Sequence, residues 1–166
     1  MILQWMRYTV LPERRAGFER TQAAWSVLIE AAGFIARFGG WREGTAEIAA
    51  LWQNEATYKR FLDYLHDPIE RSSHQAETYI SIETQLARSF IVLPDDLQTF
   101  SEVLNTAGHF LVTPAALSPD APAPSLQFRA RHLDDPHLPL NLYLWDRPAP
   151  GSVPLEPAWT ILVPRA

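Results

Sequence analysis

One stretch of the sequence, residues 54–74, has the spacing of an amphipathic helix that begins directly after an apolar segment. Asn54 can accept hydrogen bonds from the free backbone amides at a helix start, and Glu55 lies near the positive end of the helix dipole. Apolar side chains then recur every three or four residues, which keeps one stripe against a core. They are Tyr58, Phe61, Leu62, Leu65 and Ile69. The stretch therefore predicts a helix that packs on a sheet.

Pro68 interrupts this helical pattern. Because proline lacks an amide hydrogen and disfavours helical geometry at the preceding residue, we expect a kink or break near His66 and Asp67. A helix that breaks at a histidine and then resumes often borders a cavity. The alternative is a surface turn that simply ends the helix, and the sequence leaves both interpretations open.

Strand-like segments flank two helices in the first part of the chain. A first helix is expected after Pro12, with Gly33 as its C-terminal cap. Gly39-Gly40 indicates a bulge or a close approach of another backbone. The expected order, β-α-β-β-α-β, is that of a ferredoxin-like sandwich, so the predicted fold class is α+β. The expected strands are 2–10, 34–41, 46–53 and 78–86.

The first strand has no polar face. Leu3 and Trp5 lie on one side of it, and Ile2 and Met6 lie on the other, so we expect both sides to be covered. Two helices cover only one face of a four-stranded sheet. The other face, with Trp5 and Tyr79, cannot remain fully wet. Either a second subunit or the rest of this chain is expected to supply the missing layer.

The last third of the chain is rich in proline but keeps strand-like segments at 126–132, 140–146 and 158–163. Residues 87–93 either extend the fourth strand or begin another. A short helix is expected to begin with a cap at Asp95 or Asp96 and to end at Gly108, and residues 118–125 are expected to form a loop.

An internal similarity suggests how this last third is organised. FIARFGGW and AEIAALWQNE in the first half resemble LQFRARHLD and LNLYLWDRP in the second. We therefore expect residues 1–90 to form a ferredoxin-like α/β-barrel unit. Residues 91–166 are expected to form a degenerate second βαββ-like half, or a strand-rich C-terminal extension, packed on the first. Chance similarity between apolar strands is the alternative.

Composition excludes several classes of function. The formal net charge of −5 provides no basic surface for nucleic acid or an anionic membrane. The chain has no cysteine, which excludes disulfides and thiolate chemistry. No apolar run approaches the roughly 20 residues that span a bilayer, and residues 1–10 do not read as a signal peptide. We therefore expect a cytoplasmic protein with no nucleic-acid or membrane partner.

Several short motifs point to a known family. They are Trp5-x-Arg7, Gly39-Gly40-Trp41, Leu51-Trp52, His66-Asp67 and Glu156-Pro157-Ala158-Trp159. With the element order over residues 1–90, they resemble the uncharacterised YdbC-like group of the dimeric α/β-barrel superfamily. That superfamily includes the antibiotic-biosynthesis monooxygenases and the haem-degrading monooxygenases. The resemblance implies a homodimer in which two sheets pack face to face and enclose a cavity.

The haem-degrading branch of this superfamily fits the sequence poorly. In those relatives a histidine near the end of the second helix holds the iron, helped by a tryptophan on that helix and an asparagine on the first strand. His74 is nearest to the histidine position, but Phe61 replaces the tryptophan and Gln4 replaces the asparagine. We therefore expect no haem and no other cofactor. His74 then reads more simply as the residue that ends the helix.

The cofactor-independent monooxygenases of the superfamily, which act on aromatic polyketides, imply a different site. Such chemistry needs an apolar pocket, a group that orients a phenol and exclusion of water. His66 and Arg7 are the candidate catalytic residues, because either could stabilise a phenolate. A role for the tryptophans in the core or at an interface is the alternative. The candidate ligand-binding residues are Trp5, Arg37, Trp41, Tyr64, His74 and Tyr79.

Two other groups of polar residues have simpler interpretations than a site. Four charged residues in strands predict either a salt-bridged cluster or an anion site around Arg7, since isolated buried charges are costly. His132 and His137 lie in a proline-rich loop, where solvation explains them better than a metal ion does, so we expect no metal. The four charged residues are Arg7, Arg37, Glu47 and Glu83.

These patterns favour an uncharacterised small-ligand-binding protein of the superfamily, with a small aromatic ligand. The alternatives are a cofactor-independent monooxygenase that acts on an aromatic or polyketide-like substrate, and a structural or interaction module. The first two require a pocket that reaches Trp5, Arg7 and His66. The third predicts that side chains fill that volume.

Overall fold

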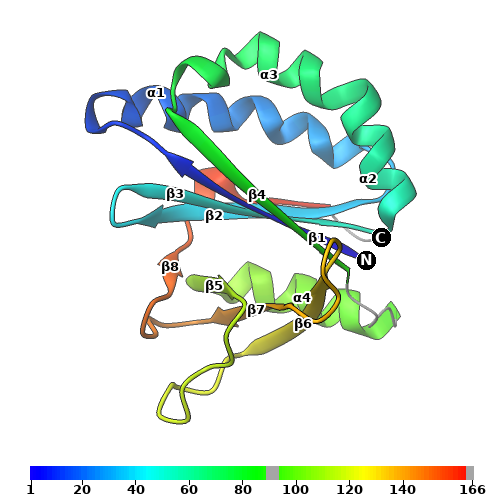
Figure 1. Ribbon diagram of the computed structural model, residues 1–166, viewed down its shortest axis with the longest axis vertical. Coiled ribbons are helices and arrows are strands. Elements are labelled where there is room, and N and C mark those ends of the chain that lie inside the picture. Colours follow the sequence, from blue (N-terminus) through cyan, green and yellow to red (C-terminus); the bar gives the residue numbers. More distant parts are fainter. Residues whose placement is uncertain (89–93, 164–166) are drawn as a thin grey trace.

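The computed structural model of the 166-residue chain describes residues 1–88 and 94–163. The first part is a four-stranded antiparallel sheet in the order β4-β1-β3-β2, with all of its helices on one face (Figure 1). The predicted ferredoxin-like, α+β fold is confirmed. Its strands are β1 (Ile2–Thr9), β2 (Phe34–Arg42), β3 (Thr45–Trp52) and β4 (Ser81–Arg88).

The helical layer is less regular than the sequence predicts. The first helical segment is α-helical only over α1 (Arg15–Thr21), and 3-10 turns flank it as η1 (Pro12–Arg14) and η2 (Gln22–Glu30). Gly33 has a φ of +75° and lies in the turn after η2, three residues beyond its end.

The second helical segment continues past Pro68, so the expected break is not observed, and the irregularity next to Asp67 is a π-helical turn that ends at His66. Asn54 caps α2 (Glu55–Phe61), as predicted, with its side chain accepting from the Thr57 amide at 3.0 Å. A π-helical turn, η3 (Leu62–His66), then leads into α3 (Asp67–Ser73), and His66 and Asp67 both have helical backbone angles. Since π turns leave backbone carbonyls out of the α-helical pattern, the proline is accommodated without a break. After α3 come His74 in the left-handed conformation and the 3-10 turn η4 (Gln75–Glu77).

Residues 94–163 cover the second face of the sheet. The helix α4 runs over Pro94–Thr106, so it begins before Asp95 and ends two residues before Gly108. Residues 89–93, where a further strand was considered, lie outside the described part of the chain. The strands and turn of this layer are β5 (His109–Thr113), β6 (Leu126–His132), β7 (Pro139–Trp145), β8 (Val153–Pro154), η5 (Pro157–Trp159) and β9 (Ile161–Leu162).

The two layers belong to one sheet that curls back on itself. Its nine strands follow the order β8-β5-β7-β6-β4-β1-β3-β2-β9, and β6 joins β4 through the pairs Ala87–His132 and Arg88–Arg131. At the other end, the Glu156 amide donates to the Gly39 carbonyl at 2.9 Å, which brings the segment after β8 against β2. The predicted close backbone approach at Gly39-Gly40 is therefore observed, whereas the bulge in β2 lies at Phe34–Ala36.

The second layer repeats the strand order of the first. If β5, β6, β7 and β8 are matched with β1 to β4 in turn, the order β8-β5-β7-β6 equals β4-β1-β3-β2. This matching pairs β2 with β6 and β3 with β7, the same segments whose sequences resemble each other. Leu51-Trp52 and Leu144-Trp145 then end equivalent strands. The repeat supports our proposal that residues 91–166 are a degenerate second half, in which loops replace both helices between strands.

Apolar side chains fill the space between the two layers. Leu3, Trp5 and Phe38 from the first sheet meet Phe100 of α4 and Phe110 of β5 in one buried cluster. A ring of about eight strands encloses just enough room for its own side chains, which agrees with this packing. The interior of the barrel is therefore a packed core, and the candidate site lies outside it.

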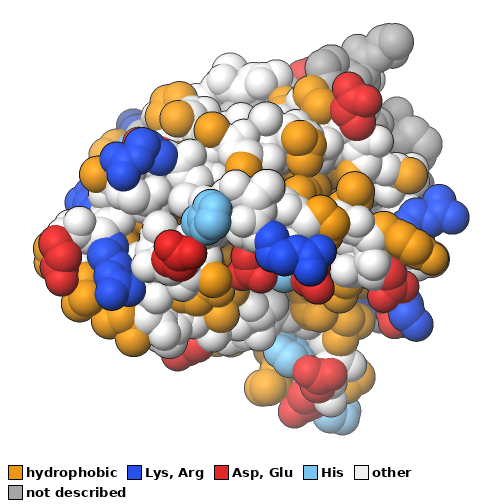
Figure 2. All heavy atoms as spheres, turned by 90° about the horizontal axis from the view of Figure 1, so that it is seen from above, with side chains coloured by type: hydrophobic (Ala, Val, Ile, Leu, Met, Phe, Trp, Pro, Cys, Tyr) orange, Lys and Arg blue, Asp and Glu red, His pale blue; other side chains and the backbone are white. Residues whose placement is uncertain are grey.

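Within the described residues, no helix has both the length and the apolar character needed to cross a membrane. Seen from the helical side, acidic and basic side chains are interspersed among apolar ones, and neither sign forms a continuous patch (Figure 2).

Candidate functional site

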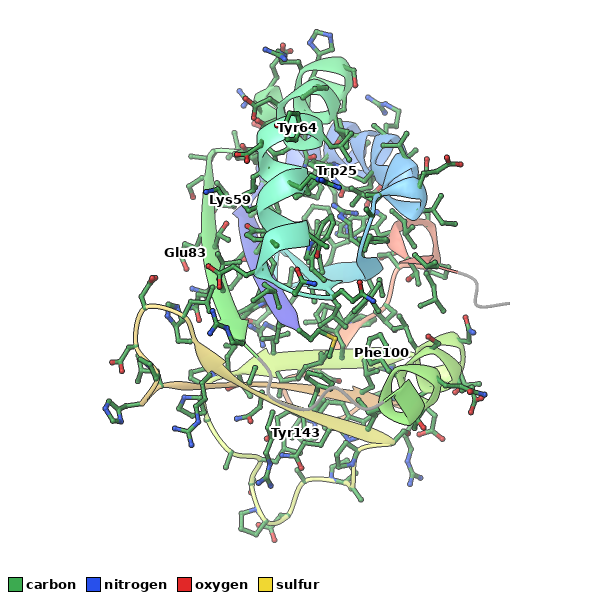
Figure 3. The ribbon with its side chains drawn as sticks, turned by 90° about the vertical axis from the view of Figure 1, so that its right-hand side faces the viewer. Trp25, Lys59, Tyr64, Glu83, Phe100 and Tyr143 are labelled. Carbon is green, nitrogen blue, oxygen red and sulfur yellow. The ribbon has the colours of Figure 1, made fainter. Side chains whose placement is uncertain are left out.

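A cavity of about 170 Å³ lies between the helical layer and the first sheet. The sheet contributes the side chains of β1 that point away from the barrel interior, among them Gln4 and Tyr8, together with residues of β2, β3 and β4. The helical layer contributes Trp25 of η2, which lies between the helices and the sheet in Figure 3, and residues of α2, η3, α3 and η4. The cavity is therefore formed by residues 1–88 alone.

Aromatic rings form one wall of the cavity. The rings of Trp52 and Phe61 are stacked with centroids 4.6 Å apart, and Trp25 lies 6.3 Å from Phe61. Leu62 and Ile82 also line the cavity and are 40% and 42% exposed, so it opens to the surface between η3 and β4. An apolar wall with a mouth to solvent suits a small ring-bearing molecule.

The π turn places His66 at the edge of this wall. The His66 ring lies 5.9 Å from Trp25 and 5.7 Å from Phe61 between ring centroids. Its Nδ1 is hydrogen-bonded to the Asp67 carboxylate at 3.0 Å, which leaves Nε2 as the ring atom available to a ligand. That hydrogen bond is also the main reason why the pKa of Asp67 lies below its ordinary value.

Arg37 is a charged residue that lines the cavity and is only 2% exposed. Its Nη2 donates to Gln22 Oε1 at 2.6 Å, and its guanidinium carbon lies 5.2 Å from the centre of the Trp25 ring. Burial lowers the pKa of Arg37 to about 10, so it remains protonated at neutral pH. Among the described residues, no carboxylate forms an ion pair with it.

Tyr8 and Gln75 complete the polar part of the cavity. Burial raises the pKa of Tyr8 far above its ordinary value, so its hydroxyl stays neutral. Gln75 Oε1 accepts a hydrogen bond from Trp25 Nε1. Its amide is near enough to Tyr8 to oppose part of that pKa rise, but no hydrogen bond of normal geometry joins them.

Several buried donors in the described part of the chain have no hydrogen-bond partner. Three of these atoms belong to residues that line the cavity: Arg37 Nη1, Trp52 Nε1 and Gln75 Nε2. The fourth, His109 Nδ1, lies at the start of β5. Since buried polar groups are nearly always paired, three unpaired N–H groups around one cavity suggest that an acceptor is missing from it.

Trp5 and Arg7 lie on the opposite face of the sheet from His66 and do not share its cavity. Trp5 is part of the barrel core, where its Nε1 donates to Glu47 at 3.3 Å. Arg7 forms an ion pair with Glu83 in a separate, polar hollow. There Glu47 pairs with Arg42, and burial raises the pKa of Glu47. Of the four charged strand residues, Arg7, Glu47 and Glu83 thus form salt bridges, as one of the two alternatives predicted, and Arg37 forms none with the described residues.

Of the other predicted ligand-binding residues, Tyr79 lies next to the cavity, and Trp41 and Tyr64 lie away from it. Trp41 packs on Trp159 with ring centroids 5.4 Å apart and belongs to a separate apolar cluster. Tyr64 is 71% exposed on the outer side of η3. Tyr79 contacts the cavity indirectly, because its ring packs on Tyr8. Of the predicted site residues, His66 and Arg37 are the ones that line the cavity.

Haem does not fit the arrangement. The His74 side chain is 72% exposed and hydrogen-bonded to Glu77, outside the cavity. A volume of about 170 Å³ is also below the roughly 300–1,000 Å³ of ordinary ligand pockets. Gln4 and Phe61, which stand where the haem-degrading relatives carry an asparagine and a tryptophan, line the cavity, whereas His74 does not.

One group of possible metal ligands was not predicted from the sequence. Ligand atoms of His66, Asp67 and Glu70 lie within 4.8 Å of one another at the edge of the cavity. Neighbouring positions on one helical segment explain the grouping, and both carboxylates already bind protein groups. Asp67 is paired with His66, and Glu70 accepts from the Tyr79 hydroxyl at 3.2 Å.

Sequence reasoning missed Trp25 and Gln75 as site residues. Trp25 follows the apolar spacing of the first helical segment and therefore read as a core residue. Gln75 gives no signal, because it reaches the cavity through the left-handed turn at His74.

Comparisons with known proteins agree with this fold. Residues 2–87 match the model of a domain of unknown function, DUF4937. The uncharacterised protein YdbC of Bacillus subtilis (strain 168) is 33% identical over 88 residues, which are 50% of this chain and 74% of YdbC.

Two solved structures are similar over most of the chain. A candidate monooxygenase of Lactobacillus acidophilus NCFM has a TM-score of 0.54 at 9% identity, over 88% of this chain and 77% of that one. A candidate monooxygenase of Fusobacterium nucleatum subsp. nucleatum ATCC 25586 has a TM-score of 0.53 at 9% identity, over 87% and 75%. At such identities the likeness shows the fold alone.

Proposed function

The chain belongs to the DUF4937 family through the residues that build the cavity, and from this premise we propose that it binds a small organic ligand there. The observation that carries the proposal is an aromatic wall, formed by Trp25, Trp52 and Phe61, in a cavity with an opening to solvent. An apolar protein cavity of about 150 Å³ holds one benzene ring, so this cavity suits a ligand of one ring. A fused polyketide would require the mouth to open further.

Filling the cavity tests this proposal. Ala50 lies on β3, lines the cavity and is 2% exposed, so Ala50→Leu places three more carbon atoms inside it. We expect the affinity for benzyl alcohol, measured by calorimetric titration, to fall at least about tenfold, which corresponds to 1.4 kcal/mol. Ala56→Leu adds the same atoms on the exposed surface of α2 and should leave the affinity unchanged. Equal binding by all three proteins would place the ligand elsewhere.

The second candidate function is a cofactor-independent monooxygenase that acts on a small phenolic substrate. The position of His66 favours it: Asp67 fixes Nδ1, and Nε2 is left to take a proton from a ligand beside a positively charged Arg37. The names of the two similar structures are in line with this chemistry, and the substrate would supply its own electrons.

Oxygen consumption with a panel of hydroxylated aromatic compounds tests this alternative. We expect His66→Ala to lower turnover about 10²-fold, the usual scale for a lost general base. Arg7→Ala should retain turnover, because Arg7 pairs with Glu83 outside the cavity. A loss in Arg7→Ala with none in His66→Ala would instead support the site around Arg7.

Assembly and location complete the proposal. A cytoplasmic location is proposed from a composition without cysteine. A homodimer would have to form through a different, exposed surface, because β5–β8 and α4 already cover the sheet face on which a partner was expected. The mass of the native particle in solution, against 18.8 kDa for one chain, distinguishes a dimer from a single chain whose second half replaces the partner.

A further inference from the structure

Three residues that line the cavity carry N–H groups without an acceptor. Arg37 Nη1, Trp52 Nε1 and Gln75 Nε2 have no hydrogen-bond partner among the described residues, and the three residues are each no more than 2% exposed. A guanidinium nitrogen and an amide nitrogen each carry two hydrogens, so the residues that line the cavity hold several N–H groups without an acceptor. Leaving such groups unpaired in an apolar setting is unfavourable, and the molecule gains if a ligand supplies oxygen atoms.

The charge of the cavity points in the same direction. Arg37 is protonated at neutral pH and has no carboxylate in an ion pair among the described residues. The neighbouring Tyr8 stays neutral because burial raises its pKa. Glu70 lines the cavity, but its Oε1 accepts from the hydroxyl of Tyr79, and within the described part of the chain it forms no ion pair with Arg37. Among those residues the buried positive charge therefore has no paired carboxylate.

Resting on the ligand-binding function proposed above, we infer that the ligand is a small organic acid. Its carboxylate receives hydrogen bonds from Arg37 Nη1 and Gln75 Nε2, and its apolar body lies on the aromatic wall. A carboxylate has about four acceptor positions, which matches a site with several free N–H groups, and hydrogen bonds to a charged donor are the stronger kind. A neutral ligand or water would satisfy some of the donors but would leave the charge of Arg37 unpaired.

Calorimetric titration with three probes of one shape tests this inference. Benzoate, benzyl alcohol and benzylammonium share a ring and differ in the charge of the attached group. With the unmodified protein at pH 7 we expect benzoate to bind at least tenfold more tightly than benzyl alcohol. Benzylammonium should not bind, because its charge repeats that of Arg37.

Two substitutions separate the charge from the shape of the cavity. Arg37→Met removes the charge at similar length. Gln75→Glu introduces a carboxylate into the lining of the cavity that Arg37 also lines, and it keeps an acceptor for Trp25 Nε1. The new carboxylate should then take the place of the ligand's own. Both variants should lose the preference for benzoate and still bind benzyl alcohol. Arg60→Met, at an exposed position of α2, should behave like the unmodified protein, and circular dichroism checks that each variant is folded.

The outcomes distinguish this inference from the function on which it rests. Equal affinities of the unmodified protein for benzoate and benzyl alcohol would overturn the acid and leave the ligand-binding cavity. A benzoate preference that survives both Arg37→Met and Gln75→Glu would also overturn it. If none of the three probes binds, both the acid and the ligand-binding function are wrong.

Discussion

Phe38→Ala is expected to destabilise both halves of the chain together. Phe38 is fully buried in the barrel core, and its ring lies 5.3 Å from Phe110 at an angle of 89° and 6.2 Å from Phe100. Truncation of a buried phenylalanine to alanine costs about 3–5 kcal/mol, because it removes apolar contact and leaves a cavity. For a chain of this length each kcal/mol lowers the melting temperature by roughly 2–4 °C, so we expect a decrease of roughly 6–20 °C.

The shape of the unfolding curve tests more than the size of the shift. Phe38 belongs to β2, whereas its ring partners belong to α4 and β5, so the loss should appear in a single calorimetric transition. Leu138→Ala, at a side chain that is 52% exposed, is the control and should change stability by less than about 0.5 kcal/mol. Two separate transitions, one of them at the melting temperature of the unmodified protein, would show that residues 1–90 and 91–166 unfold as independent domains.

The sequence predicted the first ninety residues well because their signals are local. The cap at Asn54 and the burial of Tyr58, Phe61 and Ile69 are read from a few neighbouring residues and are observed. Leu62 and Leu65, which were expected in the same buried stripe, lie in the π turn and are 40% and 37% exposed. The alternation along β1, with Trp5 towards one side and Met6 towards the other, likewise needs no knowledge of the partner.

The second half was predicted in part: the strands expected at 126–132 and 140–146 are observed as β6 and β7, whereas β5 and β8 were not expected, because they are short and depend on distant contacts. β8 has two residues, and it pairs with β5, more than forty positions away in the chain. Neither segment has a length or an alternation of apolar and polar residues that would identify it as a strand from its local sequence. The similarity between β2–β3 and β6–β7 was visible, but only the strand order shows that it reflects equivalent positions.

The candidate site could be predicted only in part, because the sequence does not show on which face of the sheet the side chains leave a cavity. Trp5 and His66 were placed in one pocket, yet large side chains such as Phe38 and Phe100 fill the barrel side. The space remains on the helical side, where the π turn brings His66 to it. Which side is filled depends on side chains that are far apart in the chain, such as Leu3 and Val153, and no local sequence pattern shows their combined volume.

Gly40→Ala should open the barrel where β2 meets the segment around β8. A Cβ atom at Gly40 would lie 1.8 Å from the carbonyl oxygen of Pro154 and 3.1 Å from a methyl group of Val153. Neither backbone can move freely, since Gly40 pairs with Glu47 in the sheet and Pro154 pairs with His109. Overpacking of a core typically costs about 1–3 kcal/mol, and a clash between two backbones belongs at the upper end. We therefore expect a melting temperature lower by roughly 6–12 °C.

A second glycine provides a control of opposite sign. Gly17 lies within α1, and a Cβ atom there would meet Thr78 at 3.6 Å, an ordinary contact distance. Since alanine is favoured over glycine inside a helix by roughly 0.5–1 kcal/mol, Gly17→Ala should raise the melting temperature slightly. Hydrogen exchange then locates the damage in Gly40→Ala: the amide of Glu156, which donates to Gly39, should lose protection before the amides that join β1 to β3. A variant that melts like the unmodified protein and keeps this amide protected would show that β8 is not held against β2, and that the barrel is open on this side.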